Sequence, residues 1–197
     1  ESVQTDQLII EPTGHLRFES PTSNFISMNL FKTNEQPPIE VKGKLSTNAT
    51  TQIFGADKMI VTGELANEGK IDLDSVMMVG TSLQTLGKSG GGAGIIKRLH
   101  LNNAAGVQVA GTQNVQRIRF VQGLLNTTSQ AYIDVAGTVF DARDASHING
   151  PAGVTIFGSG DRFYPIGSNG QYRPVTITNS NTNSFDNAET IVVEAKA

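Results

Sequence analysis

Short runs of alternating apolar and polar residues, separated by glycine or asparagine, recur along almost the whole chain. Two of these runs, 41–45 and 61–65, share the pattern Val-x-Gly-x-Leu. Their offset of about 20 residues lies in the range of one solenoid repeat, and strict alternation predicts half-buried β-strands. Strands this short are not stable as isolated hairpins. We therefore expect them to bury their apolar sides by stacking coil upon coil.

The same alternating pattern continues through the middle of the chain, although its spacing varies. The clearest alternating runs are residues 39–45, 59–65, 95–101, 115–120 and 131–135. Glycine and asparagine fall between them, as expected at corners that need tight turns or a positive φ. The best helix candidates, residues 75–79 and 81–86, are too short to predict a stable helix.

Composition narrows the class of protein. The chain has 197 residues, 21 glycines and a net charge of −3, and 17% of its residues are charged. It has no cysteine, which excludes a disulfide framework and a cysteine nucleophile. Without a basic stripe we expect no nucleic-acid partner, and without about 18 consecutive apolar residues we expect no membrane insertion. The chain begins with Glu1, so we expect a removed leader or a segment of a larger protein.

The segment from Phe163 to Thr178 differs from the rest of the chain. Pro165 forces an extended approach, and the Asn169-Gly170 pair predicts a hairpin turn that brings Tyr172 back toward the preceding aromatic residues. Two interpretations remain open. The segment is an aromatic-proline clasp that closes the coil, with a cation packed on a ring, or an exposed platform for a sugar. The clasp or ligand candidates are Phe163, Tyr164, Tyr172 and Arg173.

The second half of the chain contains an ordered set of motifs that resembles a known kind of protein module. A glycine-rich lead-in and strand at residues 90–109 precede Ser-His-Ile-Asn-Gly-Pro at 146–151, and the segments 163–167 and 172–177 follow. This order resembles modules of large secreted surface proteins of the Bacteroidetes, which are adhesin-like or gliding-associated, and it covers about residues 88–180. The chain up to position 60 matches only the general coil pattern. The resemblance implies a stalk or display element at the cell surface.

Candidate chemistry is sparse. Asp141 and Asp144 are candidate calcium ligands, because hard cations prefer several oxygen ligands from one loop. The three histidines lack zinc-site spacing, and the run Gly87-Lys-Ser89 lacks the upstream glycine of a phosphate-binding loop. Asp72 and Asp74, or the two candidate calcium ligands, could form the carboxylate pair of a glycosidase. The sequence has no tryptophan to shape a sugar cleft. We expect no cofactor and no enzyme activity.

These observations predict an all-β chain. Residues 1–155 are expected to form an irregular right-handed parallel β-helix, and residues 156–197 a small antiparallel cap or the start of a next module. A pair of β-sandwiches is the alternative fold. The expected function is a non-enzymatic structural or adhesive module of an extracellular bacterial surface protein or fibre. Its partners would be other modules or copies of itself, joined by strand addition through Leu8–Ile10. The alternatives are a module that binds surface polysaccharide and a polysaccharide-cleaving β-helix enzyme.

Overall fold

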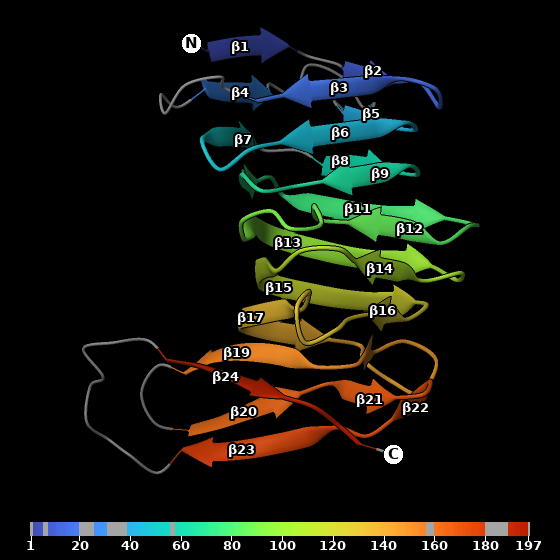
Figure 1. Ribbon diagram of the computed structural model, residues 1–197, viewed down its shortest axis with the longest axis vertical. Coiled ribbons are helices and arrows are strands. Elements are labelled where there is room, and N and C mark those ends of the chain that lie inside the picture. Colours follow the sequence, from blue (N-terminus) through green and yellow to red (C-terminus); the bar gives the residue numbers. More distant parts are fainter. Residues whose placement is uncertain are drawn as a thin grey trace.

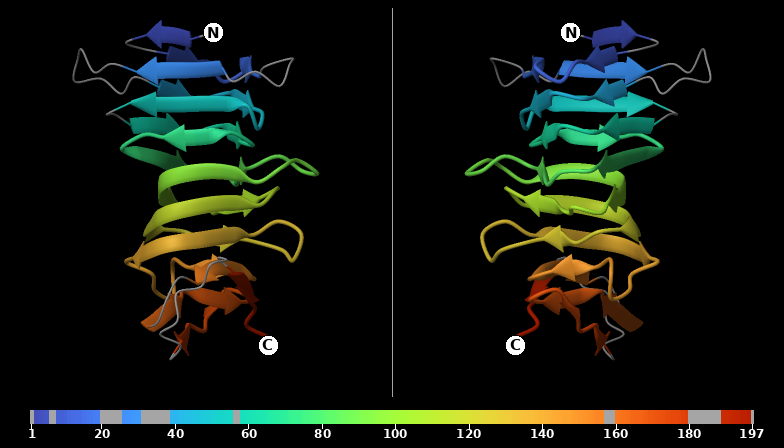
Figure 2. Two further views of the ribbon diagram at one scale, coloured as in Figure 1. Left: turned by 90° about the vertical axis from the view of Figure 1, so that its left-hand side faces the viewer. Right: turned by 90° about the vertical axis from the view of Figure 1, so that its right-hand side faces the viewer.

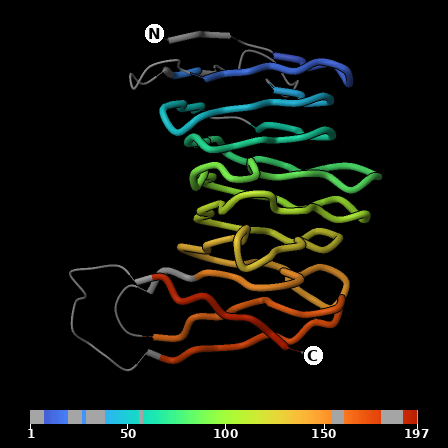
Figure 3. Tube along the Cα trace, viewed as in Figure 1, coloured from blue at the N-terminus to red at the C-terminus, as the bar shows by residue number. Residues whose placement is uncertain are grey.

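The computed structural model (Figure 1) describes residues 2–5, 8–19, 26–30, 39–55, 58–156, 160–179 and 189–196. Within these ranges the chain forms strands and turns that wind into one continuous coil (Figure 3). In Figure 1 the near strands run from right to left and the far strands from left to right as the chain descends, so the coil is right-handed. The prediction of a parallel β-helix is confirmed, and the alternative of two β-sandwiches is not observed. The described residues include no helix long and apolar enough to cross a membrane.

Each coil of the N-terminal half carries strands on three faces. The first face consists of β1 (Ser2–Thr5), β4 (Ile26–Leu30), β7 (Thr51–Gly55) and β10 (Lys70–Asp72). The second consists of β2 (Leu8–Ile10), β5 (Ile39–Val41), β8 (Lys58–Val61) and β11 (Ser75–Gly80). The third begins with β3 (His15–Phe18), β6 (Lys44–Thr47), β9 (Glu64–Ala66) and β12 (Gln84–Leu86). Of the two short segments considered as helices, 75–79 lies in β11, and 81–86 is a bend that leads into β12.

The first two faces merge in the middle of the molecule. Strand β13 (Gly94–Asn103) pairs with β10 through its first residues and with β11 through its last ones. The long strands β15 (Gln113–Gln122) and β17 (Ile133–Phe140) extend this wide sheet. The third face continues as β14 (Val107–Val109), β16 (Leu125–Asn126), β18 (Ile148–Asn149) and β21 (Ile166–Ser168). The two side views in Figure 2 show the stack of coils from both flanks.

Inward side chains stack on those of the next coil. On the third face the register places in one row Leu16, Leu45, Leu65, Leu86 and Val109. On the second face the row is Ile10, Val41, Val61, Met78, Leu101 and Phe120. All of these side chains except the first leucine are buried, and each contributes roughly 1.5–3 kcal/mol by leaving water. The two rows join in one core that runs along the coil.

The repeat found in the sequence corresponds to a corner between the second and third faces. The two valines and the two leucines of the repeat pair in register, so the step from Val41 to Val61 is one turn of the coil. At the corner, the Glu64 N–H donates to the Gly43 carbonyl over 2.8 Å. A Cβ at Gly63 would overlap that same carbonyl oxygen. Glycine is required here because the backbones of successive coils approach closely.

A chain of buried polar side chains crosses the interior between β6 and the start of β15. The Thr47 hydroxyl donates to Asn67 Oδ1 over 2.8 Å, and Asn67 Nδ2 donates to Gln113 Oε1 over 3.0 Å. Gln113 Nε2 in turn donates a hydrogen bond to the Asn67 backbone carbonyl over 2.9 Å. These groups are buried but hydrogen-bonded, so the desolvation cost of an unpaired polar group is avoided.

The C-terminal residues replace parallel stacking by antiparallel pairing. Strands β19 (Ala152–Ile156) and β24 (Glu189–Val193) form one antiparallel pair, and β20 (Gly160–Tyr164) and β23 (Val175–Asn179) form another. The third face nevertheless continues in parallel as far as β21, beyond residue 156. A small antiparallel unit is thus confirmed, whereas the division into domains 1–155 and 156–197 stays a prediction.

Substitution of Gly63 by alanine tests the close approach at the corner. The added Cβ overlaps backbone rather than a movable side chain, so we expect a loss of about 3 kcal/mol in the free energy of unfolding, as for severe overpacking. Gly92→Ala is the matched control, because a Cβ there meets only Glu68 Oε1 at 4.0 Å. Chemical denaturation of both variants measures the difference, and equal midpoints would contradict this account of the corner.

Candidate functional site

The C-terminal segment folds as a turn that closes the third face. Strand β21 pairs antiparallel with β22 (Gln171–Tyr172). The two turn residues, Asn169 and Gly170, have φ values of 52° and 74°, which is the type I′ geometry favoured in two-residue hairpins. The hairpin predicted from the Asn-Gly pair is therefore confirmed. The Arg173 N–H donates to the Ile166 carbonyl over 2.8 Å and holds the residue after β22 against β21.

The four clasp or ligand candidates do not converge on one surface. Tyr164 is fully buried, whereas its neighbour Phe163 is 47% exposed on the opposite side of β20. The ring of Tyr172 lies 5.3 Å, between centroids, from that of the buried His147. Arg173 extends outward and donates to the Gln171 side chain over 2.8 Å. This arrangement favours the clasp interpretation for Tyr164 and Tyr172, because the first ring is buried and the second lies against the ring of a buried histidine.

The candidate calcium ligands lie in a compact loop after β17. Asp141 adopts a φ of 61° and accepts from Arg119 Nε over 2.8 Å. Asp144 is exposed. Arg143 lies between them and donates to backbone carbonyls, including those of Phe120 at 3.3 Å and Val121. Among the residues that the structure describes, no group of three or more histidine or acidic side chains is arranged to hold a metal ion.

The carboxylates considered for glycosidic chemistry each face a cation. Asp72 accepts from Lys97 at 2.6 Å, and Asp74 pairs with Arg98 at 3.2 Å. The side chain of Asp74 is 63% exposed. The structure thus places these two acids in separate ion pairs.

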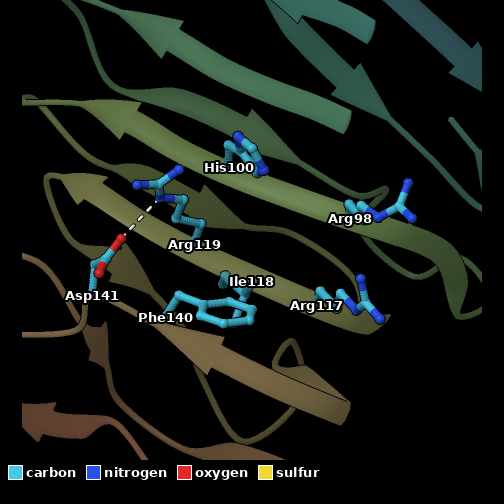
Figure 4. A pocket seen from close by; sticks show the side chains of 7 residues that line it. All are labelled: Arg98, His100, Arg117, Ile118, Arg119, Phe140 and Asp141. Carbon is cyan, nitrogen blue, oxygen red and sulfur yellow. Dashed lines mark hydrogen bonds and ion pairs between the residues drawn. The ribbon is translucent and has the colours of Figure 1, made fainter. Parts of the chain in front are cut away.

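A cluster of cations lies on the outer side of the wide sheet, at β13 and β15 (Figure 4). The parallel register sets Arg98 opposite Arg117 and His100 opposite Arg119. The next strand, β17, sets Phe140 opposite Arg119. We call these five residues the basic patch. With Asp141 they line a cavity of about 350 Å³, which is within the size range of pockets for small molecules.

The cations of the basic patch are only partly neutralised. Arg98 and Arg119 each have an exposed carboxylate partner, Asp74 and Asp141. Exposed ion pairs of this kind contribute little, because water screens them. Arg117 is exposed, and within the described parts of the chain its side chain has no hydrogen-bond or ion-pair partner. The patch therefore keeps a positive charge, at Arg117, that the described residues do not compensate.

The pKa of His100 is lowered by burial and by the neighbouring arginines of the basic patch. Burial lowers the pKa of its imidazole below the usual 6.5, and the positive charges of Arg119 and then Arg98 lower it further. The ring is half-buried on β13 and faces outward. At neutral pH it is an uncharged group among three guanidinium groups.

The basic patch was not among the sites expected from the sequence, although its residues share a common spacing. Arg98 and Arg117 are separated by the same number of positions as His100 and Arg119. That separation is one position shorter than the step from Val41 to Val61, which is a full turn of the coil. Outward positions separated by one turn stack in a parallel coil, so this shared spacing is compatible with two stacked pairs, but only the register of the structure shows which residues lie opposite each other.

Comparisons of this chain with protein-family models, with curated proteins and with solved structures find no match.

The pKa of His100 is directly measurable. We expect NMR titration of its imidazole to give a value below 6.5, because burial and two arginines oppose protonation. The unfolded chain then binds more protons than the folded chain between the two pKa values. The stability due to neutral His100 is therefore fully present above the unfolded value, about pH 6.5, and is lost as the pH falls through the folded value.

Two substitutions separate the causes of this shift. Arg119→Gln removes a contributing charge and should raise the pKa of His100 toward its usual value, whereas Arg117 does not contribute to the shift. Arg117→Gln is therefore the matched control and should leave the titration unchanged. A wild-type pKa at or above 6.5 would contradict the described surroundings of His100.

Proposed function

We propose that this chain is a non-enzymatic structural and adhesive module of an extracellular bacterial surface protein or fibre. The observation that supports this proposal best is the uninterrupted core of in-register rows that joins successive coils from Ile10 to Ile166. Bending such a stack means separating buried rows and the strand hydrogen bonds above and below them. A coil of this kind is a stiff rod with long side surfaces, which suits a spacer that displays binding surfaces away from the cell.

The buried amides add to the stiffness of the rod. Asn103 Nδ2 donates to Gln84 Oε1 over 2.8 Å, and Gln84 Nε2 donates to the Val61 carbonyl over 2.8 Å. These bonds connect three successive turns of the coil through side chains. Because each amide has its partners only in one register, they oppose sliding of one coil over the next.

The two ends of the rod differ, which suits assembly in one direction. Strands β1, β2 and β3 are the last strands of their faces, and among the described residues none has a neighbour on its outer edge. The other end is covered by antiparallel strands. Open strand edges pair readily with another chain. We infer that the N-terminal coil is extended by a strand from an adjoining module or a second copy of the chain.

Proline at the open edge tests strand addition. The Lys44 N–H donates to the Gly14 carbonyl over 2.9 Å. By the alternation of a parallel pair, the Leu16 N–H then bonds β6 and the Arg17 N–H faces the open edge. Arg17→Pro removes this edge donor and leaves the β3–β6 ladder intact. We expect concentration-dependent association of the wild-type chain, measured by sedimentation velocity, to be at least tenfold weaker in this variant.

The matched control is Arg17→Ala, which removes the same exposed side chain and its ion pair with Glu19 but keeps the N–H. It should associate like the wild type. Deleting the whole first coil is a poorer test, because it would only expose β5 and β6 as new edges. Unchanged association of Arg17→Pro would contradict strand addition at β3. A wild-type chain that stays monomeric at all concentrations would contradict extension by a second copy of the chain.

The extracellular location is tested separately. Antibodies raised against the folded chain should label intact cells that make the protein, and mild protease treatment of those cells should remove the signal. Labelling that requires permeabilised cells would contradict a surface function.

A further inference from the structure

We propose that the basic patch, formed by Arg98, His100, Arg117, Arg119 and Phe140, binds an acidic polysaccharide that carries uronate carboxylates or sulfate groups. The anionic groups of the chain would be bound by the three arginines, and one sugar ring would lie against Phe140. This site goes beyond a structural function, and it lies on the side of the rod rather than at the end where strand addition is tested.

The first support is the electrostatic repulsion that arises because two arginines lie opposite each other on neighbouring strands. Neighbouring strands lie about 4.8 Å apart, and the register sets Arg98 directly opposite Arg117. Like charges directly opposite each other destabilise a sheet. Elsewhere on the coil the outward pairs include Lys44 opposite Glu64, which form an ion pair at 2.6 Å. An external polyanion would convert the unfavourable row of arginines into a favourable one.

The second support is the shape of the patch. In Figure 4, Arg98 and Arg117 extend to one side, Arg119 and Asp141 lie on the other, and the ring of Phe140 lies between them. All five of these side chains line the same cavity. A ligand with anionic groups at intervals along its length can therefore contact both sides while its middle covers the ring. A single small anion would contact only one side.

The third support is the identity of the groups. Guanidinium groups bind carboxylate and sulfate oxygens through two parallel hydrogen bonds, which gives strength and direction. Phe140 is 46% exposed, although an aromatic side chain gains more from burial than almost any other residue. A ring left open beside three arginines provides an apolar surface for the C–H face of a sugar.

The carboxylates already present do not block the site. The side chains of Asp74 and Asp141 are 63% and 51% exposed, so their pairs with Arg98 and Arg119 are weak and can open. Arg117 can bind an anion without first breaking an ion pair, because its side chain has no partner among the described residues. We therefore expect Arg117 to be the cation on which affinity depends most.

Nucleic acid is the competing polyanion, and the charge of the whole chain argues against it. Acidic residues outnumber lysine and arginine by 18 to 15, whereas nucleic-acid-binding domains are usually basic overall. The patch also presents one exposed ring, where single-stranded nucleic acid usually stacks several bases in succession on aromatic groups.

The test is direct titration of the full chain, by calorimetry, with an oligogalacturonate, a heparin-derived oligosaccharide and neutral dextran oligomers. We expect at least one acidic ligand to bind, with an affinity that falls as salt is added, and dextran not to bind. In the wild-type chain the His100 ring signals should shift on binding, because the imidazole lies within the patch. This NMR measurement needs no variant and remains informative if a substitution disturbs folding.

Variants locate the site. Arg117→Gln should lower the affinity about tenfold, as expected for loss of one charge-assisted contact. Phe140→Ala should lower it several-fold. Arg17→Gln is the matched control, because it removes another exposed positive charge, at the far N-terminal coil, and it should bind like the wild type.

Several outcomes would overturn the assignment. They are absence of binding by both acidic oligosaccharides, equal binding of dextran, equal losses in Arg117→Gln and Arg17→Gln, or tighter binding of a single-stranded oligonucleotide than of either acidic oligosaccharide. Unchanged His100 signals at saturation would also place any binding elsewhere.

Discussion

Parallel, in-register stacking of one coil on the next sets the conditions for every other feature of this molecule. A strand here has few local contacts, and its neighbours are about one turn away in sequence. Leu45 packs between Leu16 and Leu65, and an apolar residue is required at each of these levels. The same rule fixes the corner, where Gly43 and Gly63 succeed each other because their backbones approach too closely for any side chain. Two features of the composition follow from this geometry: glycine at corners and aliphatic residues inside.

Departures from a regular turn are stabilised by buried polar groups. The loop between β12 and β13 leaves the coil before Gly94, and the amides of Asn67 and Gln113 lie against that glycine from the coils on either side. These two residues are 46 positions apart, more than twice the spacing of the regular corner. On the outside, Glu68 holds the same loop by accepting from Lys88 over 2.6 Å and from the Gly92 N–H over 2.7 Å. An irregular solenoid can thus remain continuous if polar side chains occupy the gaps that its insertions create.

The sequence predicts the fold well, because alternation and the repeat at residues 41–45 and 61–65 are local patterns. It also predicts the Asn169-Gly170 turn, for which a single pair of residues suffices. It does not predict which distant residues meet. On the second face Met59 pairs with Val76 and Val76 with Leu99, so the second of these turns is longer than the first. With such variation, the opposition of Arg98 and Arg117 depends on the lengths of corners and loops between strands, which no single-sequence period specifies. The pairing of Tyr172 with His147 was missed for the same reason.

Register also links the inside of the coil to its surface. Leu99 and Ile118 are stacked and buried in the core, and this contact forces their neighbours Arg98 and Arg117 to be stacked on the outside. Moving one strand along its neighbour would separate the arginines but would also shift the apolar row that supports them. Single substitutions of an exposed arginine would remove the repulsion at little cost in stability, since surface changes of this kind usually matter little. The unfavourable charge pair is therefore not a necessary result of the fold, which supports the proposal that an anionic ligand binds at the widest sheet of the rod.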